Sequence, residues 1–202
     1  MSPAVRDFYE QTSQYTLTIT PLWSRRAQPL YWLFKQLIAA RIGQANLPFT
    51  QAEAQRGVVS GIETLTVPGD LPATLRVWTR AYVATNEPLY VGVYTTYRHE
   101  GRGFVGVGFP LSSANFTATL LPANGDDGAL FLRAQQGNDA HAGHYLSALE
   151  PDGRLTVVKI PALGEEIHVI DDAGSLRTEH RFQVWGQTFL SLNYTMEPKD
   201  TD

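Results

Sequence analysis

The chain has 202 residues, of which 43% are hydrophobic and 18% are charged, with a formal net charge of −4 and no cysteine. A chain of this size can bury a core without disulfides, and the lack of cysteine excludes a thiolate metal site and a cysteine nucleophile. The acidic balance disfavours nucleic-acid binding, and no apolar run approaches the roughly 20 residues of a membrane-spanning helix. We therefore predict a cytoplasmic protein of one domain, residues 1–202, with no nucleic-acid partner and no transmembrane segment.

The first 43 residues are predicted to form a helical N-terminal segment. Ser2 followed by Pro3 is typical of a capped helix start. The residues that would share one face of this first helix are Val5, Phe8, Tyr9 and Thr12.

A second helix is predicted over residues 29–42, because Pro29 is typical of a helix start and Gly43 of a helix end. Its apolar residues follow the 3.6-residue period of a helix: Leu30, Leu33, Phe34, Leu37, Ile38 and Ile42. The ordinary interpretation is a helix that packs on a sheet or plugs the end of a barrel. A lid or a membrane-surface helix is the alternative, which Tyr31 and Trp32 keep open.

From Val58 to Met196 the sequence alternates between polar and apolar residues in short segments that are separated by turn signals. Such a pattern predicts a mainly β fold: an up-and-down antiparallel barrel of about ten strands, lipocalin-like in architecture, with one or two N-terminal helices. The predicted strands span 58–67, 73–83, 89–98, 102–109, 115–121, 128–136, 143–149, 153–160, 165–171, 176–184 and 187–196.

One hairpin can be predicted down to its register. A two-residue loop at Ala173 and Gly174 pairs Ile167 with His180 and sets Glu166 opposite Arg181, whereas a slip of one residue would mix apolar and charged faces. This register also pairs residue 169 with residue 178 and puts His180 on the inward face. The last strand then contributes Leu190, Leu192, Tyr194 and Met196 to the interior.

The stretch from Arg98 to Pro110 contains Gly101, Gly103 and Gly106 at the spacing of a dinucleotide-binding loop. That loop requires a following helix whose N-terminus binds the phosphates, and Pro110 would interrupt a helix begun there. The chain also lacks the motifs of a protein kinase. We therefore interpret the glycines as the bend of a barrel strand and predict no cofactor, with Phe104, Gly106 and Gly108 on the inward face.

Three histidines are candidates for metal binding or acid–base chemistry. Asp139, His141 and His144 are interpreted as a solvated hairpin loop, because on a strand the two histidines would point to opposite faces; we predict no metal site. His180 is a lone imidazole on an apolar face, which suits a satisfied core residue, a polar anchor in a cavity or a general base. Catalysis would need a second convergent group, and Glu63 and Glu150 are candidates only because they lie in or beside strands.

Aromatic residues make up 11% of the chain, and many of them lie in the predicted strands. They are Trp78, Tyr82, Tyr90, Tyr94, Tyr97, Phe104, Phe109, Phe116, Phe131, Tyr145, Phe182, Trp185 and Tyr194. We predict a non-catalytic protein that holds a small lipophilic ligand, with the contact residues His180, Tyr194, Gly106, Gly108, Phe104 and Phe182. The alternatives are an enzyme that uses His180 as acid or base, and a structural or partner-binding barrel with a solid core.

Four stretches carry a resemblance to a known family: "FVGVGFPLSSANFTATLLPAN", "GALFLRAQ", "GHYLSAL" and "TEHRFQVWGQTFLSLNYTMEP". They look like the soluble C-terminal region of bacterial YndJ-like proteins and their stand-alone relatives, over about the last half of the chain. The resemblance implies a bacterial protein of an uncharacterised family and carries over no functional residues. The lipocalin G-x-W signature is absent, so the likeness to lipocalins is one of architecture only.

Overall fold

The computed structural model describes residues 1–11, 14–39, 44–54, 58–67, 73–125, 127–134, 139–172 and 174–198. The N-terminal part contains α1 (Pro3–Glu10), β1 (Tyr15–Trp23), α2 (Gln28–Phe34), the π-helical turn η2 (Lys35–Ala39) and α4 (Gln51–Ala54). The remaining strands are β2 (Val58–Val67), β3 (Ala73–Tyr82), β4 (Pro88–His99), β5 (Arg102–Pro110), β6 (Asn115–Asn124), β7 (Leu130–Arg133), β8 (Gly143–Leu149), β9 (Leu155–Lys159), β10 (Leu163–Asp172), β11 (Ser175–Val184) and β12 (Gln187–Pro198).

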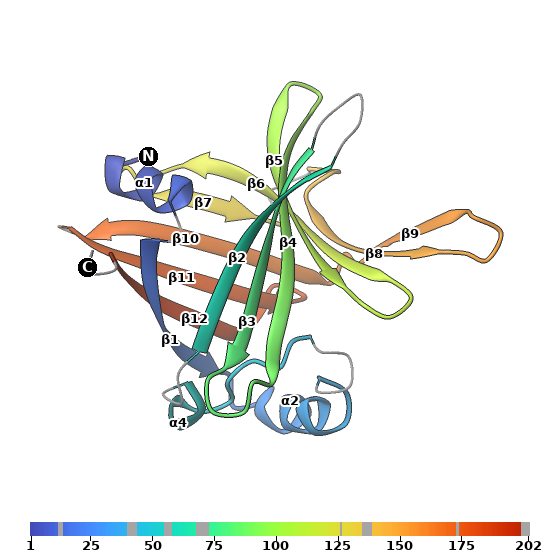
Figure 1. The fold of residues 1–202 in the computed structure, drawn as a ribbon, viewed down its shortest axis with the longest axis horizontal. Helices are drawn as coiled ribbons and strands as arrows, with labels where there is room; N and C mark the ends of the chain where they lie inside the picture. The colour runs from blue at the N-terminus through green and yellow to red at the C-terminus, as the bar shows by residue number, and fades with distance from the viewer. Residues whose placement is uncertain are drawn as a thin grey trace.

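The strands form one 12-stranded sheet with the order β1-β12-β11-β10-β7-β6-β5-β4-β3-β2, and β8 and β9 branch from β6. Strand β6 belongs to both halves of this sheet, because its first part pairs with β8 and its last part with β7. The sheet curls at this point, so that β2–β4 cross in front of β1 and β10–β12 (Figure 1). Within the described residues the edge strands β1 and β2 do not pair, so the sheet is open and the predicted closure into a barrel is not confirmed.

The predicted mainly β, antiparallel architecture is confirmed, and each predicted segment from residue 58 onward corresponds to a strand. The strand β1 was not predicted. Its sequence, YTLTITPLW, alternates threonine with apolar residues, which favours a half-buried strand. Pro21 is compatible with β1 because β1 is an edge strand, where one backbone N–H can be spared.

The predicted register of the β10–β11 hairpin is confirmed: Ile167 pairs with His180, Val169 with Thr178 and Glu166 with Arg181. Glu166 forms ion pairs with both Arg133 and Arg181. The ladder with β12 continues the same pattern, and its register shifts between Phe182 and Gln183. Apolar alternation therefore determined this part of the sheet.

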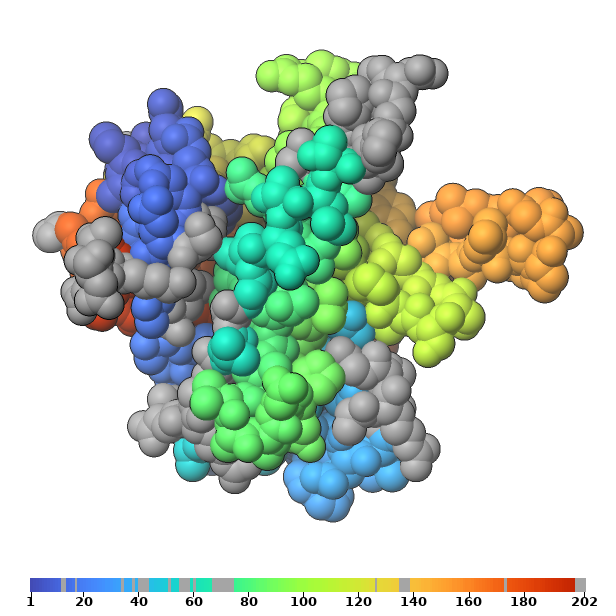
Figure 2. All heavy atoms as spheres, in the orientation of Figure 1, coloured from blue at the N-terminus to red at the C-terminus, as the bar shows by residue number. Residues whose placement is uncertain are grey.

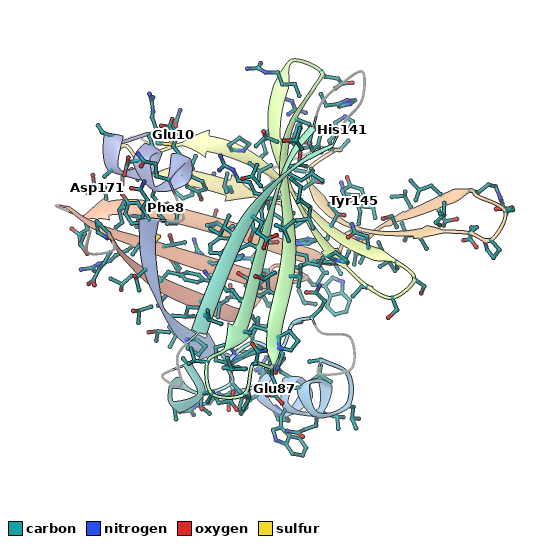
Figure 3. The ribbon with its side chains drawn as sticks, viewed as in Figure 1. Phe8, Glu10, Glu87, His141, Tyr145 and Asp171 are labelled. Atoms are coloured by element: carbon teal, nitrogen blue, oxygen red, sulfur yellow. The ribbon has the colours of Figure 1, made fainter. Side chains whose placement is uncertain are left out.

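Helix α1 begins at the predicted cap, where the Ser2 hydroxyl accepts a hydrogen bond from the Val5 backbone N–H at 3.2 Å. Val5 and Phe8 are buried in the main core together with residues from both sheet halves: Val107, Ala118, Leu120, Leu130, Leu132, Ala134, Val169, Leu176 and Met196. Figure 3 shows Phe8 below α1, between the helix and the sheet. The helix thus covers one end of the curled sheet.

The predicted helix over 29–42 corresponds to α2 and η2, with residues 40–43 and the side chains of Phe34 and Ile38 outside the described part of the chain. Its apolar stripe is not buried as expected, because Leu30, Leu33 and Leu37 are 72%, 47% and 50% exposed. These leucines border a cavity instead of filling a core. The space-filling view shows α2 at the opposite end from α1, with the β8–β9 hairpin protruding from the body (Figure 2).

Candidate functional site

A cavity of about 1760 Å³ lies between the two halves of the sheet and reaches from α1 to α2. Ligand sites usually have volumes of about 300–1,000 Å³, so the interior has room for a small molecule. Most of its lining is apolar or aromatic and comes from strands β3–β6 on one side and β10–β12 on the other. The interior of this sheet is therefore not a solid core.

Three of the predicted contact residues line this cavity: His180, Phe182 and Tyr194. The His180 ring packs against Phe182, with 4.1 Å between ring centroids, and lies 6.4 Å from the Tyr194 ring. The inward residues predicted for the last strand, namely Leu190, Leu192, Tyr194 and Met196, all line it as well. The prediction of which side chains of β11 and β12 face the interior is therefore right.

The other three predicted contact residues do not line the cavity. Along β5 the cavity-facing residues are Val105, Val107 and Phe109, so alternation turns Phe104, Gly106 and Gly108 to the opposite face. Phe104 is 1% exposed there and stacks on Tyr97, with 5.6 Å between ring centroids. The prediction of an inward face for these residues was wrong, because the glycines leave room for outer side chains; the Tyr97 ring lies 3.6 Å from where a Cβ on Gly106 would be.

The most unusual group in the cavity is a carboxylate between two imidazoles. Glu165 on β10 contacts His180 Nε2 with Oε1 at 2.7 Å and His144 Nε2 with Oε2 at 2.9 Å. Glu165 and His144 are 9% and 3% exposed. The His144 ring also stacks on Phe116, and its Nδ1 is buried without a hydrogen-bond partner among the described residues. Each imidazole can donate its Nε2–H to the carboxylate, which fixes both rings.

Burial of Glu165 raises the pKa of its carboxyl, but hydrogen bonds from His144 and His180 lower it, as does the positive charge of either ring when protonated. The net effect is a pKa of about 2, below the ordinary value of 4.5. Glu165 is therefore ionised at neutral pH despite its burial, and it is a hydrogen-bond acceptor only.

We expect the Glu165 cluster to make the protein sensitive to acid. A pKa that is lower in the folded state stabilises the fold fully above the unfolded value, and this stabilisation is lost as pH falls from about 4.5 towards about 2. The full shift corresponds to about 3 kcal/mol. Urea denaturation at a series of pH values will measure it. A Glu165→Gln variant should show a smaller loss over this range, and an equal loss in both proteins would contradict the assignment.

A second buried polar group, Arg80 on β3, faces the cavity from the other half of the sheet. Arg80 is 3% exposed, and its guanidinium lies 4.4 Å from the Trp78 ring, 5.6 Å from Tyr90 and 5.8 Å from Tyr194. Burial raises the pKa of Tyr194 and of the neighbouring Tyr94, so both phenols stay protonated at neutral pH. This side of the cavity thus presents one cation surrounded by aromatic rings and hydroxyl groups.

The residues that were predicted to share a solvated loop, Asp139, His141 and His144, lie in two separate places. His144 lies in β8 and points into the cavity, so its assignment to a solvated loop was wrong. Asp139 accepts hydrogen bonds from the backbone N–H groups of His141 and Ala142 and pairs with Arg102 at 2.5 Å. Asp139 and His141 lie at the far end of the sheet from α2, where Figure 3 labels His141. His141 thus lies in the loop before β8 and His144 within the strand, so the expectation for two histidines on one strand does not apply to them.

A surface cluster near His141 could hold a divalent cation. His99, Glu100 and His141 each offer one ligand atom, and these atoms lie within 4.8 Å of one another. The cluster sits at the β4–β5 turn and is largely exposed, with side-chain exposures of 49%, 67% and 40%. None of the three lines the cavity.

Sequence reasoning missed Glu165 and Arg80. Neither Glu63 nor Glu150 lines the cavity, and Glu165 is the carboxylate that converges on His180. The sequence could have indicated Glu165, because side chains alternate along a strand and Glu165 therefore lies on the same inward face as Ile167 and Val169. Arg80 shares parity with Trp78 in the same way, but a charged residue is not expected on the inward face.

Comparison with known proteins gives one resemblance. No family model and no solved structure matches the chain. A protein of Bacillus subtilis (strain 168) named "Uncharacterized membrane protein YndJ" is 27% identical over 199 residues, which are 97% of this chain and 34% of that protein. The chain thus spans about a third of this relative's length. The predicted YndJ-like resemblance is confirmed, and it extends over nearly the whole chain instead of its last half.

Among the described residues, no helix combines the length and the apolar character that crossing a bilayer requires. The cytoplasmic location inferred from the sequence stays a prediction, and the relative is named as a membrane protein.

Proposed function

We propose that this protein is a non-catalytic binding protein that holds a small lipophilic ligand inside its curled, barrel-like sheet. The observation that carries this proposal is the cavity of about 1760 Å³ with its mainly apolar lining. An apolar lining with a few convergent polar groups is typical of small-molecule sites. His180, Glu165 and Arg80 supply those polar groups here.

The rim of the cavity supports an apolar ligand. Leu30, Leu33, Leu37 and Trp185 line it and are also 47% to 83% exposed. Exposed apolar side chains grouped at one place mark binding surfaces more often than chance exposure does. The cavity also argues against the alternative of a structural or partner-binding barrel with a solid core. In that alternative, the exposed leucines of α2 would form the surface that binds a partner protein.

A neutral lipophilic dye whose emission shifts in apolar surroundings, such as Nile red, tests the proposal. We expect saturable binding with a blue shift, and a Val105→Trp substitution should weaken it by about tenfold or more because the indole would project into the cavity and compete with the dye for its apolar wall. The matched control is Val157→Trp, since Val157 on β9 is 54% exposed and lies outside the lining. Absence of dye binding, or equal weakening by both variants, would contradict a lipophilic cavity.

A second candidate function is an enzyme that uses His180 as acid or base. It is favoured by the 2.7 Å contact between His180 and the ionised Glu165, since a carboxylate orients an imidazole for proton transfer. Turnover of chromogenic esters or lactones by the protein, lost in a His180→Gln variant that still folds, would select this candidate over a binding protein.

A further inference from the structure

We propose that Arg80 binds the acid group of the ligand, so that the cavity accepts a long-chain monocarboxylic acid in preference to a neutral lipid. This inference rests on the proposed binding function and assigns the chemical class of its ligand. It is carried by the geometry of a buried arginine whose charge has no direct counter-ion among the described residues.

Among the residues that the structure describes, Arg80 lacks the carboxylate partner that a buried guanidinium normally has. Within the described part of the chain, no carboxylate lies within 4.0 Å of its nitrogen atoms. Glu165 is the buried carboxylate of the cavity, and its two oxygens are engaged by His144 and His180. A buried charge is costly unless it is paired, so an anion brought by a ligand would find an uncompensated cation here.

Two hydrogen-bond donors at this place are also unused. The Nε of Arg80 and the Nε1 of Trp78 are buried and have no hydrogen-bond partner among the described residues. Both side chains line the cavity and come from the same face of β3, two residues apart. The rings of Tyr90 and Tyr194 lie 5.6 Å and 5.8 Å from the Arg80 guanidinium. These two unused donors, one from a guanidinium and one from an indole, are suited to the two oxygens of a carboxylate.

The charge count favours a carboxylate over a phosphate monoester. Arg80 is the buried arginine of the lining, whereas Arg26 and Arg76 lie exposed at its rim. A carboxylate carries one negative charge and would balance Arg80, but a phosphate monoester carries nearly two at neutral pH. Its second charge would be buried near the ionised Glu165, which opposes binding.

In the absence of ligand the Arg80 cation is stabilised by the faces of Trp78, Tyr90 and Tyr194. Replacing an unpaired buried charge with an apolar side chain of similar length is often neutral or stabilising. Arg80→Met should therefore fold with an unchanged or higher melting temperature.

The experiment compares three ligands of equal chain length, dodecanoic acid, dodecanol and dodecyl phosphate, by displacement of bound Nile red at pH 7.5. We expect the acid to bind about tenfold to hundredfold more tightly than the alcohol and more tightly than the phosphate. In Arg80→Met the preference for acid over alcohol should fall to near unity while Nile red still binds. Arg177→Met is the matched control, because Arg177 lies exposed on β11 outside the cavity, and it should keep the preference.

The outcomes separate this inference from the proposed function. No binding of Nile red to the wild-type protein means that the binding function itself fails. Binding of dye with equal affinity for acid and alcohol overturns only the assignment of Arg80, and tighter binding of the phosphate overturns the carboxylate. These wild-type comparisons hold even if Arg80→Met does not fold. Dodecanoic acid labelled with ¹³C at the carboxyl adds an independent readout: its resonance should stay that of the ionised acid well below pH 5 when bound.

Discussion

Replacing Glu165 with alanine is expected to lower the free energy of unfolding at pH 7 by about 3–5 kcal/mol, the usual cost of removing one partner from a buried ionic cluster. The variant leaves the Nε2 atoms of His144 and His180 without the oxygens that they contact at 2.9 Å and 2.7 Å. It also opens space beside two imidazole rings, of which His144 stacks on Phe116 and His180 packs against Phe182 at a tilt. Urea denaturation followed by circular dichroism measures the change.

The matched control for this prediction is Glu179→Ala in the neighbouring strand β11. The Glu179 side chain is 43% exposed, and its contact with Arg181 is 3.7 Å long. Exposed ion pairs contribute about 0–1 kcal/mol, so this variant should be nearly neutral. If Glu165→Ala were as neutral as the control, the cavity would have to be wet enough to solvate both imidazoles, and the cluster would have no structural role.

The strands could be predicted because their signals are local. Alternation of polar and apolar residues marks each strand from residue 58 onward, and tight turns such as the one before Gly174 fix the pairing of neighbours. The strand β1 also alternates, but it lies between two helices and has no hairpin partner beside it in the sequence. It pairs with β12, and the partners Ile19 and Tyr194 are far apart in the sequence. Closure of the sheet is equally non-local, and alternation within strands does not determine it.

The candidate site could be predicted only in part, for a related reason. His180 was recognised because it is a lone imidazole on an apolar face of its own strand. Glu165, His144 and Arg80 reach the same cavity from β10, β8 and β3, and a single sequence does not show which strands face one another across the curled sheet. Polar residues on inward faces contradict the expectation that charges lie outside, yet functional sites are where such local rules fail.

The polar groups of the cavity are arranged so that their charges are separated. Glu165 is ionised and held by two histidines on one side, and Arg80 lies among aromatic rings on the other. Both charges act on the same two tyrosines of the lining: Arg80 lowers and Glu165 raises the pKa of Tyr94 and of Tyr194. A ligand whose carboxylate neutralises Arg80 would lie with its acid group towards β3, which gives the cavity one orientation for an acid ligand.

Phe104 distinguishes the predicted site from the observed one, because the sequence placed it inside the cavity and the structure places it on the outer face of β5. Its ring is 1% exposed, stacks on Tyr97 and lies beneath the guanidinium of Arg102 at 5.4 Å. Phe104→Ala is therefore expected to cost about 3–5 kcal/mol of stability, typical of a deleted buried phenylalanine. The affinity for Nile red, measured on the folded variant at low temperature, should stay within about twofold of the wild-type value, a difference of well under 1 kcal/mol.

Tyr97→Ala is the control for this prediction, since Tyr97 is 42% exposed and packs on the same ring. Its loss should cost clearly less than the loss of Phe104, because part of its ring is already in water. The decisive comparison is between stability and binding in the same variant. The contrary result is a Phe104→Ala protein that has nearly wild-type stability and binds Nile red about tenfold more weakly. It would show that Phe104 lines the cavity and that the inner and outer faces of β5 are the reverse of those given above.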